Sequence, residues 1–192
     1  IPARMSGTRL PGKPLKLING MPMIWHVWSK CKEIHDPELI YIATEDLEIE
    51  KYCAEMNINC VNTGLAKTAV DRIKLFADEI IADSYINVQG DEPIVNPEDI
   101  KKILLYNKKY PDRVIFGKTS CNEIEFNDVS KAKVVCSKSG RLMYVSRAGI
   151  PVNPKGNFYS AERAIWIFAF NKANLDTYFN YGDAKIEKIE ES

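Results

Sequence analysis

Strand-length apolar segments alternate with helical segments through the first half of the sequence, and this alternation limits the fold more than any other feature. Short apolar runs predict buried strands over 38–44, 59–63 and 85–89. Apolar residues at helical spacing predict helices over 23–34, 46–56, 69–82 and a segment that begins at Pro97. Strands that alternate with helices form mainly parallel sheets. We therefore expect an α/β fold for residues 1–112.

The order of the elements changes after Arg113. Strand patterns then follow one another with little helix between them, over 113–120, 133–137, 142–146 and 164–170. Consecutive strands without crossover helices pair antiparallel. The segment from Gly149 to Gly156 contains two prolines and is expected to be a loop. A chain of 192 residues fits one domain, so we expect residues 113–192 to be an antiparallel extension of that domain.

The first fifteen residues join the end of an apolar strand to a loop that is rich in glycine and in cations. Arg4, Arg9 and Lys13 have no carboxylate between them. Glycine lets the backbone approach a ligand closely, and backbone N–H groups together with fixed cations suit a polyphosphate. The sequence therefore predicts a phosphate-binding loop. The alternative is a basic surface loop without a ligand.

The segment from Gly7 to Lys13 has the spacing of a Walker A loop, but the next residue excludes that motif. Pro14 stands where a Walker A loop has serine or threonine. Proline has no hydroxyl for Mg²⁺ and no N–H, and no long helical pattern follows directly. We therefore reject the P-loop interpretation.

Polar side chains follow two of the expected strands. Gln89 ends the strand 85–89 and Asp91 comes directly after it, at the edge of the sheet where α/β folds bind ligands. A carboxylate opposite a cationic loop can hold Mg²⁺, which takes one or two carboxylates together with substrate phosphates. The alternative is a solvated acidic turn. Arg147, after the strand 142–146, is a further candidate, and its alternative is a surface or interface arginine.

Composition excludes several classes of protein. Lys plus Arg and Asp plus Glu both number 26, so the net charge gives no reason to expect a nucleic-acid partner. The five cysteines show no C-x-x-C spacing, which favours reduced thiols over disulfides or a zinc site. We find no membrane-spanning run and no signal peptide, and we expect a cytoplasmic protein without a membrane partner.

Both ends of the sequence suggest a longer chain. The sequence begins without an initiator Met, and residues 185–192 read as the start of a helix without a stop signal. We expect the domain to continue beyond Ser192.

The sequence contains no recognisable pair of nucleophile and base. The motifs of serine hydrolases, zinc proteases and dinucleotide-binding folds are absent, and His26 and His35 do not have a metal-ligand spacing. What the residues permit is phosphoryl chemistry by positioning and charge. A nucleotide- or sugar-binding module without catalytic activity is the alternative.

Six segments occur in the order seen in the 3-deoxy-manno-octulosonate (Kdo) cytidylyltransferases, and the sequence resembles this family from Ile1 to about Pro151. The segments are Ile1-Pro-Ala-Arg4, Thr8-Arg-Leu-Pro-Gly-Lys-Pro14, Met21-Pro-Met-Ile-Trp-His-Val27, Asn87-Val-Gln-Gly-Asp-Glu-Pro93, Lys133-Val-Val135 and Tyr144-Val-Ser-Arg-Ala-Gly-Ile-Pro151. The resemblance continues more weakly to the end. It implies a Rossmann-like nucleotidyltransferase domain with a mainly parallel sheet and an antiparallel dimerisation extension.

The resemblance also implies a reaction: CTP and an acidic sugar such as Kdo give a CMP-sugar for lipopolysaccharide or capsule biosynthesis, with release of pyrophosphate and a requirement for Mg²⁺. Arg4 and Lys13 would hold the triphosphate, and Asp91 would bind Mg²⁺; these three are the expected catalytic residues. Pro2 and Ala3 would lie against the cytosine. Gln89 would contact the nucleotide or the sugar, while Arg9 and Arg147 would face the sugar or the phosphates. Members of the family are homodimers.

Three departures from the family pattern leave the substrates open. Near the nucleotide base the family has His-x-Ser-Gly-Thr-[Asp/Glu]-Arg, and this sequence has Ala-Lys-Thr-Ala-Val-Asp-Arg at 66–72. The last two residues are kept, but the Ser-Gly that would meet the base is absent, so the selectivity for cytidine stays open. Ala164 and Phe168 stand where the family has His and Tyr, which suggests a sugar related to Kdo. The family's second metal-binding aspartate would lie beyond Ser192. A nucleotidyltransferase for another base or sugar therefore stays open.

Overall fold

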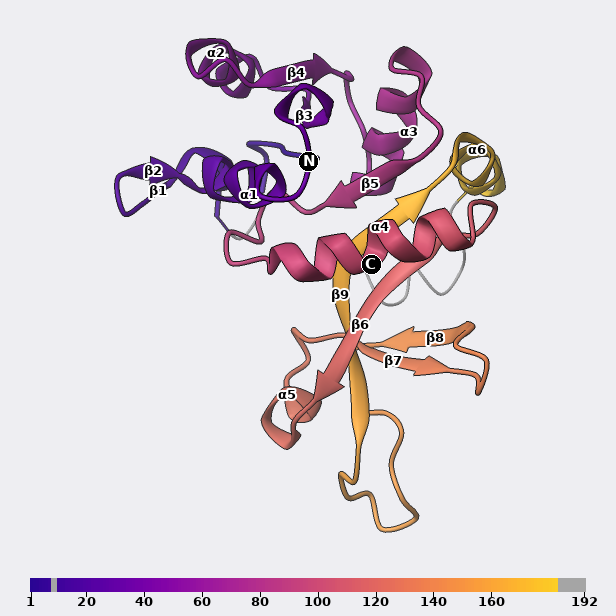
Figure 1. The fold of residues 1–192 in the computed structure, drawn as a ribbon. Helices are drawn as coiled ribbons and strands as arrows, with labels where there is room; N and C mark the ends of the chain where they lie inside the picture. Colours follow the sequence, from indigo (N-terminus) through magenta and orange to yellow (C-terminus); the bar gives the residue numbers. More distant parts are fainter. Residues whose placement is uncertain (8–9, 183–192) are drawn as a thin grey trace. The chain divides into compact units, whose positions relative to one another are not determined.

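The computed structural model describes residues 1–7 and 10–182 of the chain. The chain divides into two compact units, which are drawn in Figure 1. The first consists of Ile1–Ile115 and Ile167–Asn180, and the second contains Phe116–Trp166.

The first unit contains the alternating strands and helices that the sequence predicts. Its helices are α1 (Met23–Lys32), α2 (Leu47–Glu55), α3 (Ala69–Glu79), α4 (Pro97–Lys109) and α6 (Lys172–Tyr181). Its strands are β1 (Leu17–Ile18), β2 (Met21–Pro22), β3 (Tyr41–Thr44), β4 (Asn59–Asn62), β5 (Tyr85–Val88) and the last residues of β9 (Ala161–Phe170). Two short 3₁₀ turns, η1 (Lys13–Leu15) and η2 (Pro37–Leu39), lie before β1 and β3.

Parallel pairing around β3 forms the centre of this unit. β3 pairs in parallel with β4, and residues 1–3 run parallel to its other edge. The Ala3 N–H donates to the Ala43 carbonyl, and the Ala43 N–H donates to the Ile1 carbonyl, both at 2.9 Å. β5 pairs antiparallel with Ile167–Phe170 of β9. The chain thus leaves the sheet at Ala3 and enters the basic loop.

Local sequence sets where the helices begin. Thr68 caps α3 through a capping box with Asp71, and Asn96 caps α4 with Pro97 at its first position. The apolar face of α3 packs against β5, β9 and α6 in a cluster of buried residues that comprises Ile73, Ala77, Tyr85, Phe170 and Leu175.

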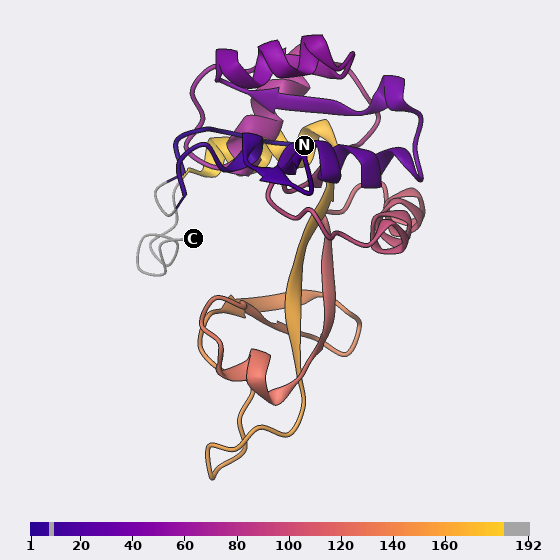
Figure 2. The same ribbon diagram turned by 90° about the vertical axis from the view of Figure 1, so that its left-hand side faces the viewer.

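The second unit is an antiparallel sheet. Its elements are β6 (Ile115–Cys121), α5 (Glu123–Asn127), β7 (Lys133–Cys136), β8 (Leu142–Ser146) and the first residues of β9. β7 pairs antiparallel with both β8 and β9, and β6 lies beside β9 (Figure 2). Ala132, Val134 and Ala164 form its apolar centre.

The structure confirms the predicted α/β fold and its antiparallel extension. It adds α5 and α6, which the sequence analysis did not predict. The structural units divide at 115/116, and Ile167–Asn180 belong to the first of them. The functional division of one domain into residues 1–112 and 113–192 stays a prediction. The expected helix at 185–192 lies outside the described residues.

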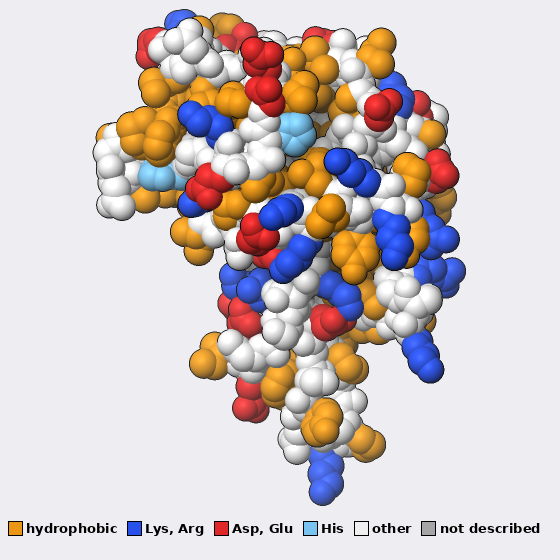
Figure 3. Space-filling model, in the orientation of Figure 1, with side chains coloured by type: hydrophobic (Ala, Val, Ile, Leu, Met, Phe, Trp, Pro, Cys, Tyr) orange, Lys and Arg blue, Asp and Glu red, His pale blue; other side chains and the backbone are white. Residues whose placement is uncertain are grey.

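Two properties of the described residues concern binding to membranes and to nucleic acids. No helix among them is long and apolar enough to cross a membrane. On the face drawn in Figure 3, Lys and Arg side chains are interspersed with Asp and Glu side chains and do not form one continuous basic patch.

Candidate active site

A hollow of about 480 Å³ in the first unit is lined by six of the eight residues that the sequence analysis selected. Three segments line it: the N-terminal segment 2–14, the start of α3 with the residues before it, and residues 89–91 after β5. The polar residues expected to touch a nucleotide or a metal thus come from segments that lie far apart in the sequence. The lining residues predicted from the sequence are Pro2, Ala3, Arg4, Lys13, Gln89 and Asp91.

Two predicted residues are not among those lining this hollow. Arg9 lies outside the described residues. Arg147 belongs to the second unit, where its guanidinium donates a hydrogen bond to the Val129 carbonyl at 3.3 Å. Their predicted contacts with the sugar or the phosphates stay predictions.

The N-terminal loop closes on itself. The Gly12 N–H donates to the Met5 carbonyl at 2.9 Å, and Gly12 has a φ of 69°, a conformation that glycine adopts without strain. The Met5 N–H donates to Asp46 Oδ2 at 2.7 Å, which ties the loop to the start of α2. Only the three-residue turn η1 follows Gly12, which agrees with the rejection of a Walker A loop.

The cation and the carboxylate expected to bind phosphate and metal are paired with each other. Lys13 Nζ lies 2.9 Å from Asp91 Oδ2, and their side chains are 36% and 52% exposed. An ion pair this exposed to water contributes at most about 1 kcal/mol to stability. A ligand with more negative charge can therefore take Lys13 away from Asp91 at little cost.

The donor set for a metal contains one carboxylate. In residues 1–7 and 10–182, no three His, Cys, Asp or Glu side chains are grouped so that they could hold a metal ion by themselves. Asp91 alone suits Mg²⁺ bound to a nucleotide, because that ion takes most of its ligands from phosphate and water.

The third wall of the hollow is formed by Ala66, Thr68, Ala69 and Arg72, which belong to the segment that the resemblance implies near the nucleotide base. The sequence analysis did not name these four as site residues. Arg72 is only 2% exposed. Its Nη2 lies 2.6 Å from Glu45 Oε2, and its Nη1 donates to Thr63 Oγ1 and to the Gly64 carbonyl. The retained Asp-Arg of the 66–72 segment was the signal for this wall.

The electrostatics of Glu45 follow from this contact. Burial by itself raises the pKa of Glu45, but the hydrogen bond and the positive charge of Arg72 outweigh burial. The pKa of Glu45 therefore lies below its ordinary value of 4.5, and the carboxylate stays charged.

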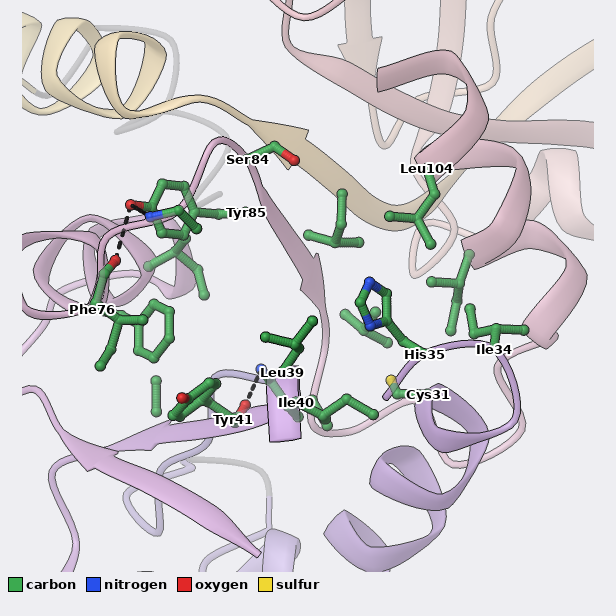
Figure 4. A pocket seen from close by; sticks show the side chains of 18 of the residues that line it. Cys31, Ile34, His35, Leu39, Ile40, Tyr41, Phe76, Ser84, Tyr85 and Leu104 are labelled. Atoms are coloured by element: carbon green, nitrogen blue, oxygen red, sulfur yellow. Dashed lines mark hydrogen bonds between the residues drawn. The ribbon is translucent and has the colours of Figure 1, made fainter. Parts of the chain in front are cut away.

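A second, apolar cavity of about 370 Å³ lies elsewhere in the first unit (Figure 4). Side chains from α1, β3, α3, β5 and α4 line it, and Cys31, His35, Tyr41, Phe76 and Tyr85 are among them. None of the predicted site residues lines this cavity. It therefore offers no grouped charges for a phosphate or a metal.

The two departures on β9 lie in apolar surroundings. Ala164 is buried with Ala132 and Val134, and Phe168 packs against the cluster that contains Tyr85 and Phe170. The structure gives these two side chains a packing role within their units.

Comparisons with known proteins identify the family of this chain. The family model described as cytidylyltransferase matches residues 1–192. An 8-amino-3,8-dideoxy-manno-octulosonate cytidylyltransferase from Shewanella pealeana is 32% identical, over 99% of this chain and 80% of its own. A 3-deoxy-manno-octulosonate cytidylyltransferase from Cellvibrio japonicus is 33% identical, with the same coverage of both chains.

Solved structures give the same result. The chain is similar to CMP:2-keto-3-deoxy-manno-octonic acid synthetase complexed with CTP, with a TM-score of 0.91 and 29% identity, over 99% of this chain and 80% of that one. A cytidylyltransferase from Leptospira borgpetersenii, with a TM-score of 0.62 and 16% identity, shares the fold.

The Glu45–Arg72 pair predicts a pH dependence of stability. Because folding lowers the pKa of Glu45, its contribution to the free energy of unfolding is complete above the unfolded-state pKa of about 4.3. That contribution is lost as the pH falls through the lower folded-state pKa. We expect Glu45→Gln to lower stability at neutral pH by about 2–3 kcal/mol, because it leaves Arg72 buried without its counterion. Urea unfolding at several pH values measures both effects.

The variant and the wild type should therefore differ less in stability at acidic than at neutral pH. The exposed Glu48, on α2, provides the control, since Glu48→Gln should follow the wild type at every pH. A constant difference between Glu45→Gln and the wild type would contradict the prediction.

Proposed function

This chain belongs to the cytidylyltransferase family, and we propose that it transfers CMP from CTP to the anomeric hydroxyl of an eight-carbon sugar acid of the Kdo type. The sugar oxygen attacks the α-phosphorus, the bond from that phosphorus to the β-phosphate oxygen breaks, and pyrophosphate leaves. The observation that carries the proposal is one hollow that brings Arg4, Lys13, Gln89 and Asp91 together in a chain that matches the family throughout.

Arg4 and Lys13 are proposed to bind the triphosphate. Both line the hollow, and the loop closure between Met5 and Gly12 holds the segment that carries them. Negative charge shifts to the pyrophosphate during the reaction, and cations fixed beside it stabilise the transition state more than the ground state. Pro2 and Ala3, which are buried and have no polar side-chain atoms, are proposed to lie against the flat face of the cytosine.

Asp91 is proposed to hold Mg²⁺ when the nucleotide is bound. The divalent ion would neutralise phosphate charge at the site of bond cleavage. For this to happen, Lys13 has to exchange its partner, from the Asp91 carboxylate to a phosphate oxygen. Their exposed ion pair at 2.9 Å is consistent with that exchange.

The acceptor is proposed to be Kdo or its 8-amino-3,8-dideoxy relative, because the similar proteins carry both names. Arg147, Gln89 and Arg9 stay the proposed contacts to the sugar or to the phosphates. The enzyme is proposed to act in the cytoplasm.

We propose a homodimer that uses strand β8. β8 lies at the end of its sheet and pairs with β7. Leu142, Met143 and Tyr144 are 41%, 61% and 43% exposed. Neighbouring residues of a strand face opposite sides of the sheet, so β8 presents apolar side chains on both sides. An open edge of this kind favours pairing with another strand, and a second copy of this chain offers the matching edge.

The first experiment measures pyrophosphate release with Mg²⁺, CTP and each of the two sugar acids, with UTP, GTP and ATP as controls. We expect release with CTP and at least one of the sugars. Lys13→Ala should lower kcat by about 10²–10³-fold, the usual effect of removing one group that stabilises transition-state charge. Lys16→Ala, an exposed lysine on the same segment, should retain activity. CTP binding without release under any condition would favour a non-catalytic homologue.

The metal proposal is tested with Mn²⁺ as a paramagnetic substitute for Mg²⁺. Asp91→Asn should weaken the binding of Mn²⁺ in the presence of CTP, because it removes the one protein carboxylate of the site, while Glu92→Gln should change it little. Electron paramagnetic resonance measures free Mn²⁺ directly. Equal Mn²⁺ binding by Asp91→Asn and the wild type would rule out Asp91 as a ligand.

The dimer proposal is tested by sedimentation. Met143→Asp places a charge on the exposed face of β8 and should shift the protein from dimer to monomer at micromolar concentration. Ile94→Asp, at an 88% exposed position of the first unit, should leave the dimer intact. A dimeric Met143→Asp protein, or a monomeric wild type, would contradict the proposed interface.

A further inference from the structure

The connection between β4 and α3 has no regular structure, yet its backbone is held at several points. It runs from Thr63 to Thr68 and supplies part of the third wall of the nucleotide hollow. The Thr63 N–H donates to the Thr44 carbonyl at 2.8 Å, and the Gly64 N–H donates to Asn62 Oδ1 at 2.9 Å. These two bonds anchor its first residues. The residues that line the hollow come later.

Two charged side chains also hold this connection, Arg72 at its first residues and Glu45 at Ala66. Arg72 reaches back from α3 to the Gly64 carbonyl at 3.1 Å and to Thr63 Oγ1 at 2.9 Å. Glu45, directly after β3, accepts a bond from the Ala66 N–H at 3.3 Å. The same Glu45 Oε2 atom accepts from Arg72 Nη2 at 2.6 Å. One carboxylate oxygen therefore fixes both the arginine and the backbone of the wall.

Burial makes this arrangement depend on Glu45. The Arg72 side chain is 3% exposed and the Glu45 side chain 15%, so water cannot replace either partner readily. A buried guanidinium without its carboxylate would be strongly destabilised and would shift toward solvent. Such a shift would release its bonds to Thr63 and Gly64 and would move the wall.

The wall is also connected to the phosphate-binding loop. Arg4 Nη1 donates to the Lys67 carbonyl at 3.3 Å. Residues 66–72 stand where the family has the segment near the nucleotide base, so the resemblance implies that the wall at 66–69 faces the nucleoside part of the nucleotide. Its position should then affect binding of the nucleoside more than the chemistry at phosphorus.

We propose that Glu45 is a positioning residue that fixes the 63–69 wall through Arg72 and thereby determines both the affinity for CTP and the preference for CTP over UTP. The proposal rests on the proposed function, since it takes CTP as the nucleotide. Glu45 itself is not among the residues that line the hollow.

The test compares Glu45→Gln, Glu45→Asp and the control Glu48→Gln by calorimetric binding of CTP and UTP and by steady-state kinetics. Glu45→Gln should weaken CTP binding and raise KM for CTP by about tenfold, and the preference for CTP over UTP should fall severalfold. We expect kcat at saturating CTP to change less than threefold. Glu45→Asp keeps the charge and should recover part of both effects, and Glu48→Gln should behave as the wild type.

Thr63→Val is the second variant, because it removes one acceptor from Arg72 without leaving a charge unpaired. Thr63→Val should change the affinity for CTP and the preference for CTP over UTP in the same direction as Glu45→Gln, by a smaller factor. It replaces Glu45→Gln in the test if that variant does not fold. An unchanged ratio of CTP to UTP affinity in the folded variants would overturn the proposal. A parallel loss of kcat and CTP affinity would also overturn it, since that result indicates a general structural role.

The binding measurements separate this inference from the proposed function. If the wild type binds CTP without releasing pyrophosphate, the proposed reaction fails, and the change in CTP and UTP affinity still decides the role of Glu45. If the wild type binds neither CTP nor UTP, both proposals fail.

Discussion

The backbone pairing of residues 1–3 with β3 is the contact on which the candidate site depends. Two hydrogen bonds at 2.9 Å hold Ile1 and Ala3 against Ala43, so the basic loop starts at the carboxyl end of a buried parallel strand. Gly90 brings the end of β5 to the same place, since a Cβ at this position would lie 2.6 Å from the Pro2 carbonyl oxygen. The cations of one segment and the carboxylate of another meet because the backbones approach this closely.

Two ion pairs in this site show that burial determines how readily an ion pair can be separated. Lys13–Asp91 is exposed, so water and salt weaken it and a phosphate can displace it. Glu45–Arg72 is buried, so its partners are tightly coupled and separating them is costly. The first pair suits groups that exchange partners during a reaction. The second suits groups that keep a wall in place.

The sequence was sufficient to predict most elements of the first unit, though not α6, and six residues of the hollow. The strand end and the glycine-rich loop gave local signals for Arg4, Lys13, Gln89 and Asp91, whereas Pro2 and Ala3 were implied by the resemblance. The sequence did not show the contacts that hold the third wall in place. Its main contact joins Glu45 to Arg72, which lie 27 positions apart and meet only after β3, β4 and α3 have packed. The five-residue helix α5 was missed because a single turn has almost no periodicity to detect. The contacts of Arg147 with substrate were predicted from resemblance alone.

Ala164 shows why a departure from a family pattern needs a structure to interpret it. In the sequence, alanine in place of histidine suggested a lost contact with the sugar. In the structure Ala164 is 6% exposed and packs with Ala132 and Val134, so an imidazole at this position would have to be buried beside these apolar groups. The small residue is thus accounted for by packing within the second unit. It follows that Ala164 by itself is weak evidence about the sugar, and that the choice between Kdo and its 8-amino relative has to rest on polar groups that reach the substrate.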